Sequence, residues 1–176
     1  MQHVLSSRVM NKLLGLCWML LLSATAATNA SVAIAQKAAI VKFSELEKMM
    51  SMQNDTTYVF NFFATWCGPC AQELPFFQSF SAHYADKKTR VIFVSLDFKK
   101  DFRKHLIPFV KSHNVTNTVL LLDETDYNSW IDKVDSSWNG DLPATLIVNN
   151  SSHKREILHR ELSYSELEAA VKPFLP

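Results

Sequence analysis

Short apolar runs alternate along the chain with stretches that are polar or have helical periodicity. Four of these runs are hydrophobic at nearly every position, as buried strands are, and a shorter fifth run follows near the C-terminus. The predicted strands cover residues 58–63, 90–96, 119–122, 144–148 and 156–158. Helices are predicted at residues 44–50, 68–84, 101–113, 123–134 and 163–174.

The order of these elements predicts the fold class. Strands that alternate with helices, then two adjacent strands and a last helix, indicate an α/β sheet covered on both faces. Ser44 is expected to cap the first helix, and Ser163 with Glu166 three residues later has the pattern of a capping box. Pro108 is expected to interrupt the third helix. No repeat or long linker follows residue 36, so residues 36–176 are expected to form one domain.

Residues 1–35 have a different pattern. Arg8 and Lys12 precede an apolar run at residues 13–22, and small residues follow through Ala35. This order is typical of a signal peptide cleaved after Ala35 or Ala30. An uncleaved membrane anchor is the alternative, since residues 13–35 are just long enough to cross a bilayer. In both cases we expect the remaining domain to be exported, and to lie in the periplasm.

Composition narrows the class of protein. The chain has 176 residues, of which 48% are hydrophobic and 20% charged, and this excludes a disordered or collagen-like protein. The formal net charge is +1, so the chain lacks the basic excess that attracts a nucleic-acid backbone. We therefore expect no nucleic-acid partner.

The candidate chemistry lies in Trp66-Cys67-Gly68-Pro69-Cys70, which follows a predicted strand and opens a helix. Two cysteines three apart in a first helical turn are close enough to form a disulfide. Cys67 at the helix N-terminus faces unpaired N–H groups, which lower the pKa of its thiol, so it is the expected attacking sulfur. Cys70, one turn inside, is expected to be shielded and to resolve the mixed disulfide that Cys67 forms. Gly68 and Pro69 suit a tight entry into the helix.

Two other interpretations of Cys67 and Cys70 stay open. A zinc site needs two further ligands, but residues 36–176 contain no other cysteine and their histidines lack paired ligand spacing. We therefore predict no metal, with a copper- or zinc-binding module using one distant histidine as the alternative. A disulfide that closes so small a ring restricts the unfolded chain little, which argues against a purely structural role. An idle disulfide in a non-catalytic client-binding domain is the last alternative.

The same region resembles a known family. The run from Val59 to Cys70, with Glu73, Leu74 and Pro75, resembles the thioredoxin superfamily and, within it, the exported TlpA/ResA-like thiol-disulfide oxidoreductases. The resemblance covers about residues 40–176. It implies the thioredoxin fold, with a central mixed β-sheet and helices on both faces.

The resemblance also implies a contact surface for an extended client protein. Pro143 would be a cis proline lying against the two sulfurs, and the backbone of Leu142 would pair with the client as a short added strand. Trp66, beside the nucleophile, would belong to the same surface, together with Gly68 and Pro69. Two further tryptophans, Trp130 and Trp138, would line this face or pack in the core.

Glu73 matches a carboxylate that the TlpA/ResA-like proteins carry. It is expected to take the proton of the resolving thiol or to tune the thiol pKa values, and an ordinary solvated helix glutamate is the alternative. Asn61 stands where thioredoxins have a buried aspartate, and an amide cannot exchange that proton.

The expected function is reduction of disulfides in client proteins. No cofactor is expected besides the redox-active Cys67–Cys70 pair. The expected partners are disulfide-containing clients and a membrane protein that supplies electrons, and a client in cytochrome c maturation is suggested by family association alone. A thiol peroxidase is disfavoured, because it needs a lone peroxidatic cysteine.

Overall fold

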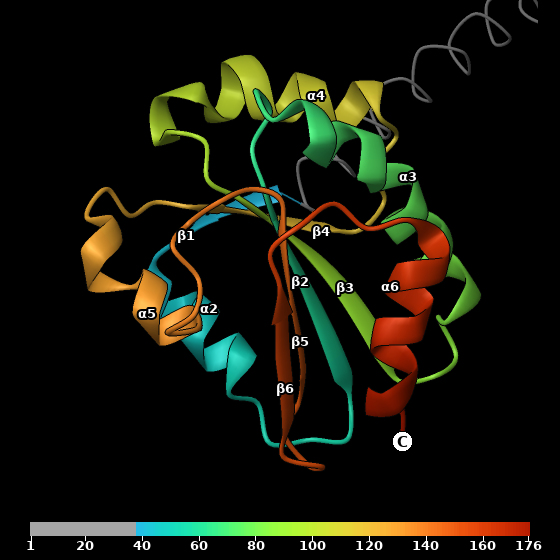
Figure 1. Ribbon diagram of the computed structural model, residues 1–176. Helices are drawn as coiled ribbons and strands as arrows, with labels where there is room; N and C mark the ends of the chain where they lie inside the picture. Colours follow the sequence, from blue (N-terminus) through green and yellow to red (C-terminus); the bar gives the residue numbers. More distant parts are fainter. Residues whose placement is uncertain (1–37) are drawn as a thin grey trace, which may run out of the picture. The chain divides into compact units, whose positions relative to one another are not determined.

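A computed structural model of the chain describes residues 38–176, and the predicted signal peptide or anchor at residues 1–35 lies outside the described residues. Six strands form one sheet in the spatial order β1-β4-β3-β2-β5-β6 (Figure 1). Strands β1, β4, β3 and β2 run parallel, whereas β5 is antiparallel to both β2 and β6. The strands are β1 (Ala38–Val41), β2 (Thr57–Phe63), β3 (Thr89–Ser95), β4 (Thr118–Leu122), β5 (Ala144–Asn149) and β6 (Lys154–Leu158).

Helices cover both faces of this mixed sheet, with α2 and α5 on one side and α3 and α6 on the other (Figure 1). The helices are α2 (Phe43–Met50), α3 (Gly68–His83), α4 (Ile107–Ser112), α5 (Ile131–Val134) and α6 (Tyr164–Val171). Short 3₁₀ turns at Lys99–Asp101, Tyr127–Ser129 and Lys172–Phe174 and a π-helical turn at Phe102–Leu106 complete the described elements. The predicted α/β architecture is confirmed.

Two predicted helix boundaries are wrong. Helix α2 begins at Phe43 rather than after a Ser44 cap, because the Glu45 carboxylate accepts the backbone N–H of Lys42. The interruption expected near Pro108 is present, because a π-helical turn at Phe102–Leu106 changes to α4 at Ile107, directly before Pro108, which has no N–H to donate. The helix expected at residues 123–134 is reduced to a 3₁₀ turn and the single turn of α5.

The sheet face under α2 and α5 is packed with aromatic side chains. Phe62 contacts Trp138 at a centroid distance of 4.7 Å, and Trp138 in turn meets Trp130 edge-on at 5.9 Å. Both tryptophans are at most 2% exposed, so they belong to the core and not to a client-binding surface. Trp138 also donates its indole N–H to the backbone carbonyl of Asp141, which ties the loop before β5 to this core.

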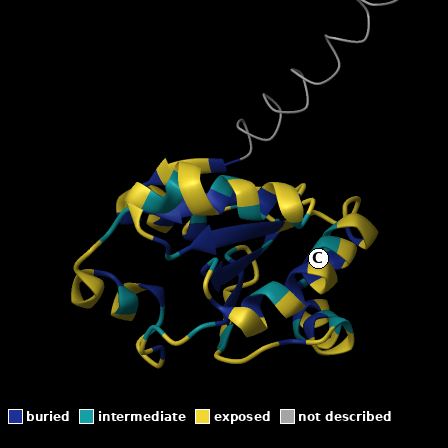
Figure 2. Cartoon of the chain, turned by 90° about the horizontal axis from the view of Figure 1, so that it is seen from above, coloured by how far each residue is buried: buried dark blue, intermediate teal, exposed yellow. Residues whose placement is uncertain are grey.

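The opposite face carries the residues that support α3. Phe93 meets Phe63 and Phe77 in edge-on contacts, at centroid distances of 6.0 and 6.2 Å. Side chains alternate along β2, so Asn61 points to this same face and lies under the helix. Figure 2 shows the strands as the buried centre, with the exposed residues on the outward sides of the helices.

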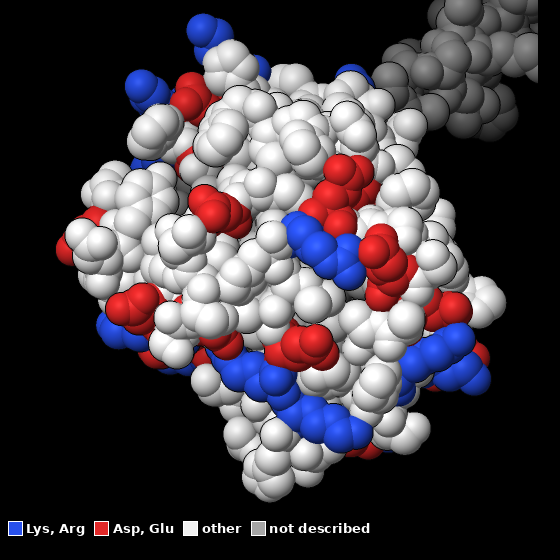
Figure 3. Space-filling view, in the orientation of Figure 1, with Lys and Arg blue, Asp and Glu red and all other residues white. Residues whose placement is uncertain are grey.

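Charged side chains of both signs are interspersed over the face seen in Figure 3. Within residues 38–176, no helix is both long enough and apolar enough to span a bilayer.

Candidate active site

The two cysteines lie where β2 ends and α3 begins. Cys67 is the N-cap residue of α3, and its Sγ accepts the backbone N–H of Cys70 at 3.3 Å. The two sulfurs are joined in a disulfide, with their Cα atoms 5.3 Å apart. Pro69 stands in the first helical turn, where it gives up no backbone hydrogen bond. The backbone therefore stabilises negative charge on the Cys67 sulfur once the bond is reduced.

Exposure distinguishes the two sulfurs. Cys70 is fully buried at 0% exposed, whereas Cys67 retains 6%. The neighbours of Cys67 lie on the surface, with Gly68 and Pro69 exposed and Trp66 at 71% the most exposed large hydrophobic side chain among residues 38–176. Cys67 is therefore the cysteine nearer the surface.

The loop before β5 lies at the same end of the sheet. The Leu142–Pro143 peptide bond is cis, as the resemblance implied. Phe62 is paired with Ala144, so Pro143 stands next to the last residue of β2, from which the Cys67 turn departs. Leu142 is half-buried and Pro143 is buried. The fold thus brings the cysteine pair and the proline loop to the same end of the sheet.

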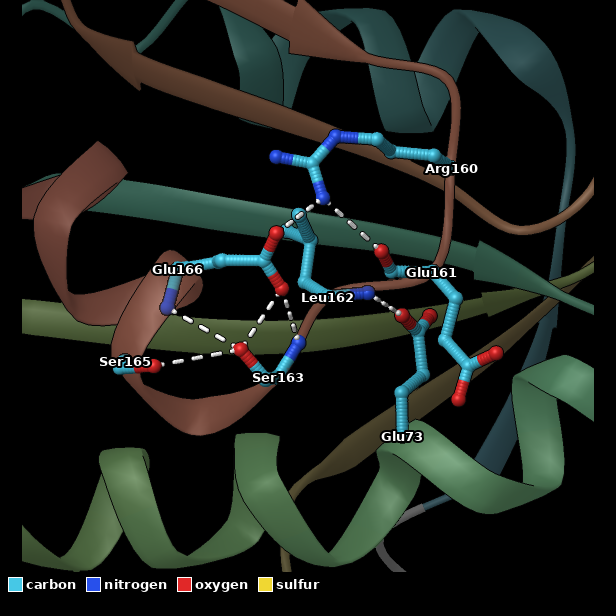
Figure 4. Close-up of polar contacts among 7 residues, drawn as sticks. All are labelled: Glu73, Arg160, Glu161, Leu162, Ser163, Ser165 and Glu166. Carbon is cyan, nitrogen blue, oxygen red and sulfur yellow. Dashed lines mark hydrogen bonds and ion pairs between the residues drawn. The ribbon is translucent and has the colours of Figure 1, made fainter.

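Glu73 lies one turn after Cys70 in α3 and is buried, at 0% exposed. Its Oε1 accepts a hydrogen bond from Nδ2 of Asn61 at 2.7 Å. Its Oε2 accepts the backbone N–H of Leu162 at 2.9 Å, as Figure 4 shows. The alternative of a solvated helix glutamate is therefore wrong.

Burial changes the acidity of this carboxyl. Loss of water around Glu73 raises its pKa from 4.5 to about 7, and the nearby charge of Glu161 acts in the same direction. The hydrogen bonds from Leu162 and Asn61 lower the pKa and offset part of that rise. Glu73 therefore exchanges a proton near neutral pH, which a surface glutamate does not.

A capping box fixes the segment that donates to Glu73. Ser163 caps α6, and the Glu166 carboxylate accepts both the backbone N–H and the hydroxyl of Ser163, at 2.9 and 2.6 Å. Arg160 binds the other oxygen of Glu166 at 2.6 Å (Figure 4). The sequence predicted this cap, but the contact of Leu162 with a residue 89 positions earlier had no local signal.

Asp97 is a supporting residue that the sequence analysis missed. It is 5% exposed, and its carboxylate accepts the backbone N–H and hydroxyl of Thr65, at 3.0 and 2.7 Å, and the hydroxyl of Ser95 at 2.7 Å. Because Phe63 pairs with Ser95, Asp97 leaves β3 beside the turn that leads to Trp66. An acidic residue directly after a predicted buried strand was the available signal.

A hollow of about 240 Å³ lies beside this turn and is open to solvent. It is lined by Thr65, Trp66, Asp97, Asp101 and His105. Residues 38–176 contain no group of three or more His, Cys, Asp or Glu side chains arranged to hold a metal ion.

Comparison with known proteins identifies the family. The model of the AhpC/TSA family matches residues 26–154. The thiol-disulfide oxidoreductase ResA of Oceanobacillus iheyensis is 28% identical over 116 residues, which are 66% of this chain and 56% of ResA. The thioredoxin-like protein YneN of Bacillus subtilis is 34% identical over 71 residues, 39% of this chain and 41% of YneN. The chain thus spans about half the length of the curated relatives it matches.

Solved structures show the same fold. A thioredoxin-related protein from Neisseria meningitidis serogroup B superposes with a TM-score of 0.58 at 21% identity, over 67% of this chain and 84% of that one. A secreted disulfide oxidoreductase of Mycobacterium tuberculosis gives a TM-score of 0.51 at 18% identity, over 69% and 84%. The predicted thioredoxin fold is confirmed, the sequence is similar to ResA, and the chain belongs to the AhpC/TSA family.

Proposed function

We propose that this protein is an exported thiol-disulfide oxidoreductase that reduces disulfide bonds in client proteins. The observation that carries the proposal is the Cys67–Cys70 disulfide at the start of α3, in which Cys67 is 6% exposed and has exposed neighbours while Cys70 is fully buried. Family membership and the similarity to ResA support the redox chemistry. The pattern of residues 1–35 supports export to the periplasm.

The reaction uses the two sulfurs in turn. In the reduced protein, the Cys67 thiolate attacks one sulfur of the client disulfide, forms a mixed disulfide and releases the other client sulfur as a thiolate. Cys70 then loses its proton, and its thiolate attacks Cys67 Sγ. This step restores the Cys67–Cys70 disulfide and releases the second client sulfur, so two electrons pass from the protein to the client. The cysteines carry these electrons themselves, and no cofactor is needed.

Glu73 is the proposed proton acceptor for Cys70. It lies three residues after Cys70, on the same side of α3, and is shielded from water. Its pKa of about 7 suits the transfer of a proton at neutral pH. A carboxylate with an ordinary pKa would be a weaker base towards a buried thiol.

The client is proposed to bind across the end of the sheet at which Cys67 lies. Trp66, Gly68 and Pro69 supply contact area around the sulfur, and the backbone of Leu142 next to Pro143 pairs with an extended client segment. A membrane protein is the proposed electron donor, because the pair has to be reduced again in an oxidising compartment. An apocytochrome c is one client that the family association suggests.

Trapping of mixed disulfides tests the roles of the cysteines. Cys70→Ser is expected to accumulate covalent complexes with clients through Cys67, whereas Cys67→Ser is the matched control and is expected to trap none. Equal trapping by both variants would refute the assignment. Insulin reduction driven by dithiothreitol tests turnover, and an idle disulfide would give no acceleration.

Two further assays separate the remaining alternatives. Tight stoichiometric binding of copper or zinc to the reduced protein, without turnover of a disulfide substrate, would favour a metal-binding module. Turnover of a hydroperoxide without reduction of insulin would favour a thiol peroxidase. The reduction potential then decides the direction of transfer, since reducing and oxidising members of this fold differ by about 150 mV.

A further inference from the structure

Asn61 is the buried partner of Glu73 to which the proposed chemistry assigns no task. It lies on β2, is 0% exposed, and donates from Nδ2 to Glu73 Oε1 at 2.7 Å. The same Nδ2 donates to Thr145 Oγ1 at 3.3 Å, on the neighbouring strand β5. The amide nitrogen therefore links the carboxylate of α3 to the strand that begins directly after Pro143.

The oxygen atom of the Asn61 amide has no hydrogen-bond partner among the described residues. Asn61 Oδ1 is buried and accepts no hydrogen bond from any residue between 38 and 176. Buried polar atoms without a partner are uncommon in folded proteins. A half-turn of the amide about its Cβ–Cγ bond therefore breaks no hydrogen bond at the oxygen end.

The two ends of the amide have opposite hydrogen-bonding character, because the nitrogen donates and the oxygen accepts. An ionised Glu73 has only acceptor oxygens and fits Nδ2, whereas a protonated Glu73 carries an O–H and fits Oδ1. The Thr145 hydroxyl fits both arrangements, since it accepts from Nδ2 or donates to Oδ1.

We propose that Asn61 is a positioning residue for Glu73: its amide donates to the ionised carboxylate and turns over to accept from the protonated carboxyl. Glu73 then keeps a hydrogen-bond partner before and after it takes a proton. An ionised aspartate at position 61 lacks the donor that the ionised Glu73 needs, and an apolar residue lacks both donor and acceptor. The catalytic meaning of this inference rests on the proposed function, but the hydrogen-bond exchange itself does not.

The other groups around Glu73 do not supply this reversal. Leu162 contributes a backbone N–H, which is a donor only and serves the ionised carboxylate. Glu161, from the same segment, is the charged side chain that acts on Glu73, and it disfavours ionisation. On α3 itself, Cys70 is held in the disulfide. Asn61 is thus the contact that changes from donor to acceptor as Glu73 titrates near neutral pH.

Nuclear magnetic resonance of the full-length oxidised protein tests the proposal without a client or an electron donor. The side-chain carboxyl carbon of Glu73 reports its titration midpoint. In Asn61→Leu we expect this midpoint to rise by about one pH unit, because the bond lost by the ionised form is stronger than the bond lost by the neutral form. The pH profile of insulin reduction is expected to move by the same amount.

A buried asparagine elsewhere in the sheet provides the matched control. Asn149, on β5, donates to Thr57 Oγ1 and to the carbonyl of Phe174 and has no contact with Glu73. Asn149→Leu is expected to weaken the fold but to leave the Glu73 midpoint unchanged. An unchanged midpoint in Asn61→Leu would overturn the proposal.

The turn of the amide is tested in the unaltered protein, so this test does not depend on a variant that folds. The nuclear Overhauser effect between the Asn61 amide protons and the Thr145 methyl group is expected to be strong at pH 9 and weak at pH 5. An equal effect at both pH values would overturn the reversal. Failure of the proposed function would instead appear as absent insulin reduction with the titration behaviour intact.

Discussion

Replacing Glu73 by glutamine is expected to abolish most of the pH dependence of stability between pH 5 and pH 8. The folded protein holds the pKa of Glu73 at about 7, against 4.5 without the fold, so within this window the folded state binds more protons than the unfolded state. The stabilising contribution of a protonated Glu73 is therefore fully present below pH 4.5 and is lost as the pH rises through 7.

The size of the effect follows from the same two values. Linkage gives a loss of about 2.5 kcal/mol in the free energy of unfolding between pH 5 and pH 8. Glutamine at position 73 does not titrate, so this loss is absent from the variant. The glutamine oxygen can accept the Leu162 N–H while its amide nitrogen faces Asn61, whose amide turns over to accept, and any cost of this replacement is the same at every pH.

Urea denaturation of the oxidised protein at several pH values between 5 and 8 provides the measurement. The compared quantity is the change in unfolding free energy with pH, because the absolute stabilities also contain the pH-independent cost. Glu168→Gln is the control: its carboxylate accepts from Tyr84 and Lys172, which lower its pKa below the window. This control is expected to keep the slope of the unaltered protein. Equal slopes in the unaltered protein and in Glu73→Gln would refute the reasoning.

Three further substitutions test the contributions of a surface residue, a core residue and a residue that supports the active-site turn. Trp66→Ala is expected to change the unfolding free energy by less than about 0.5 kcal/mol, since the side chain is 71% exposed, but to raise the KM for insulin. Trp138→Ala removes a buried indole that contacts Phe62 and is expected to cost about 3–5 kcal/mol by thermal unfolding. Asp97→Asn leaves a donor of Thr65 or Ser95 without its charged acceptor and is expected to cost about 1–3 kcal/mol by urea denaturation.

Much of the fold follows from local sequence patterns, and each wrong prediction has an identifiable physical cause. The aromatic run of β2 and the periodic residues of α3 are strong signals, because both elements bury residues in a regular pattern. Strand β1 was missed because Ala38–Val41 is short and follows a stretch of small residues. The helix expected at residues 123–134 fails because Trp130 and Trp138 hold this region to the core through tertiary contacts that outweigh helical periodicity.

The candidate site also has features that the sequence predicts and features that it does not predict. The positions of Cys67 and Cys70 in a first helical turn follow from their spacing, and the structure confirms that turn. The burial of Glu73 was not predictable, because its partner Leu162 is 89 residues away and a backbone N–H leaves no trace in the sequence. The contact between Asn61 and Thr145, 84 residues apart, likewise depends on how β5 pairs with β2.

The pairing of one amide with one carboxylate has a physical reason. Asn61 and Glu73 approach to 2.7 Å in a site from which water is excluded, and two ionised carboxylates at that distance would repel each other strongly. An aspartate at position 61 would therefore share a single proton with Glu73, and the pair would titrate in two widely separated steps. With an amide on the strand, the negative charge stays on the helix that carries Cys70. In the proposed mechanism the residue that moves the proton therefore lies on α3, and asparagine at position 61 makes the burial of its charge possible.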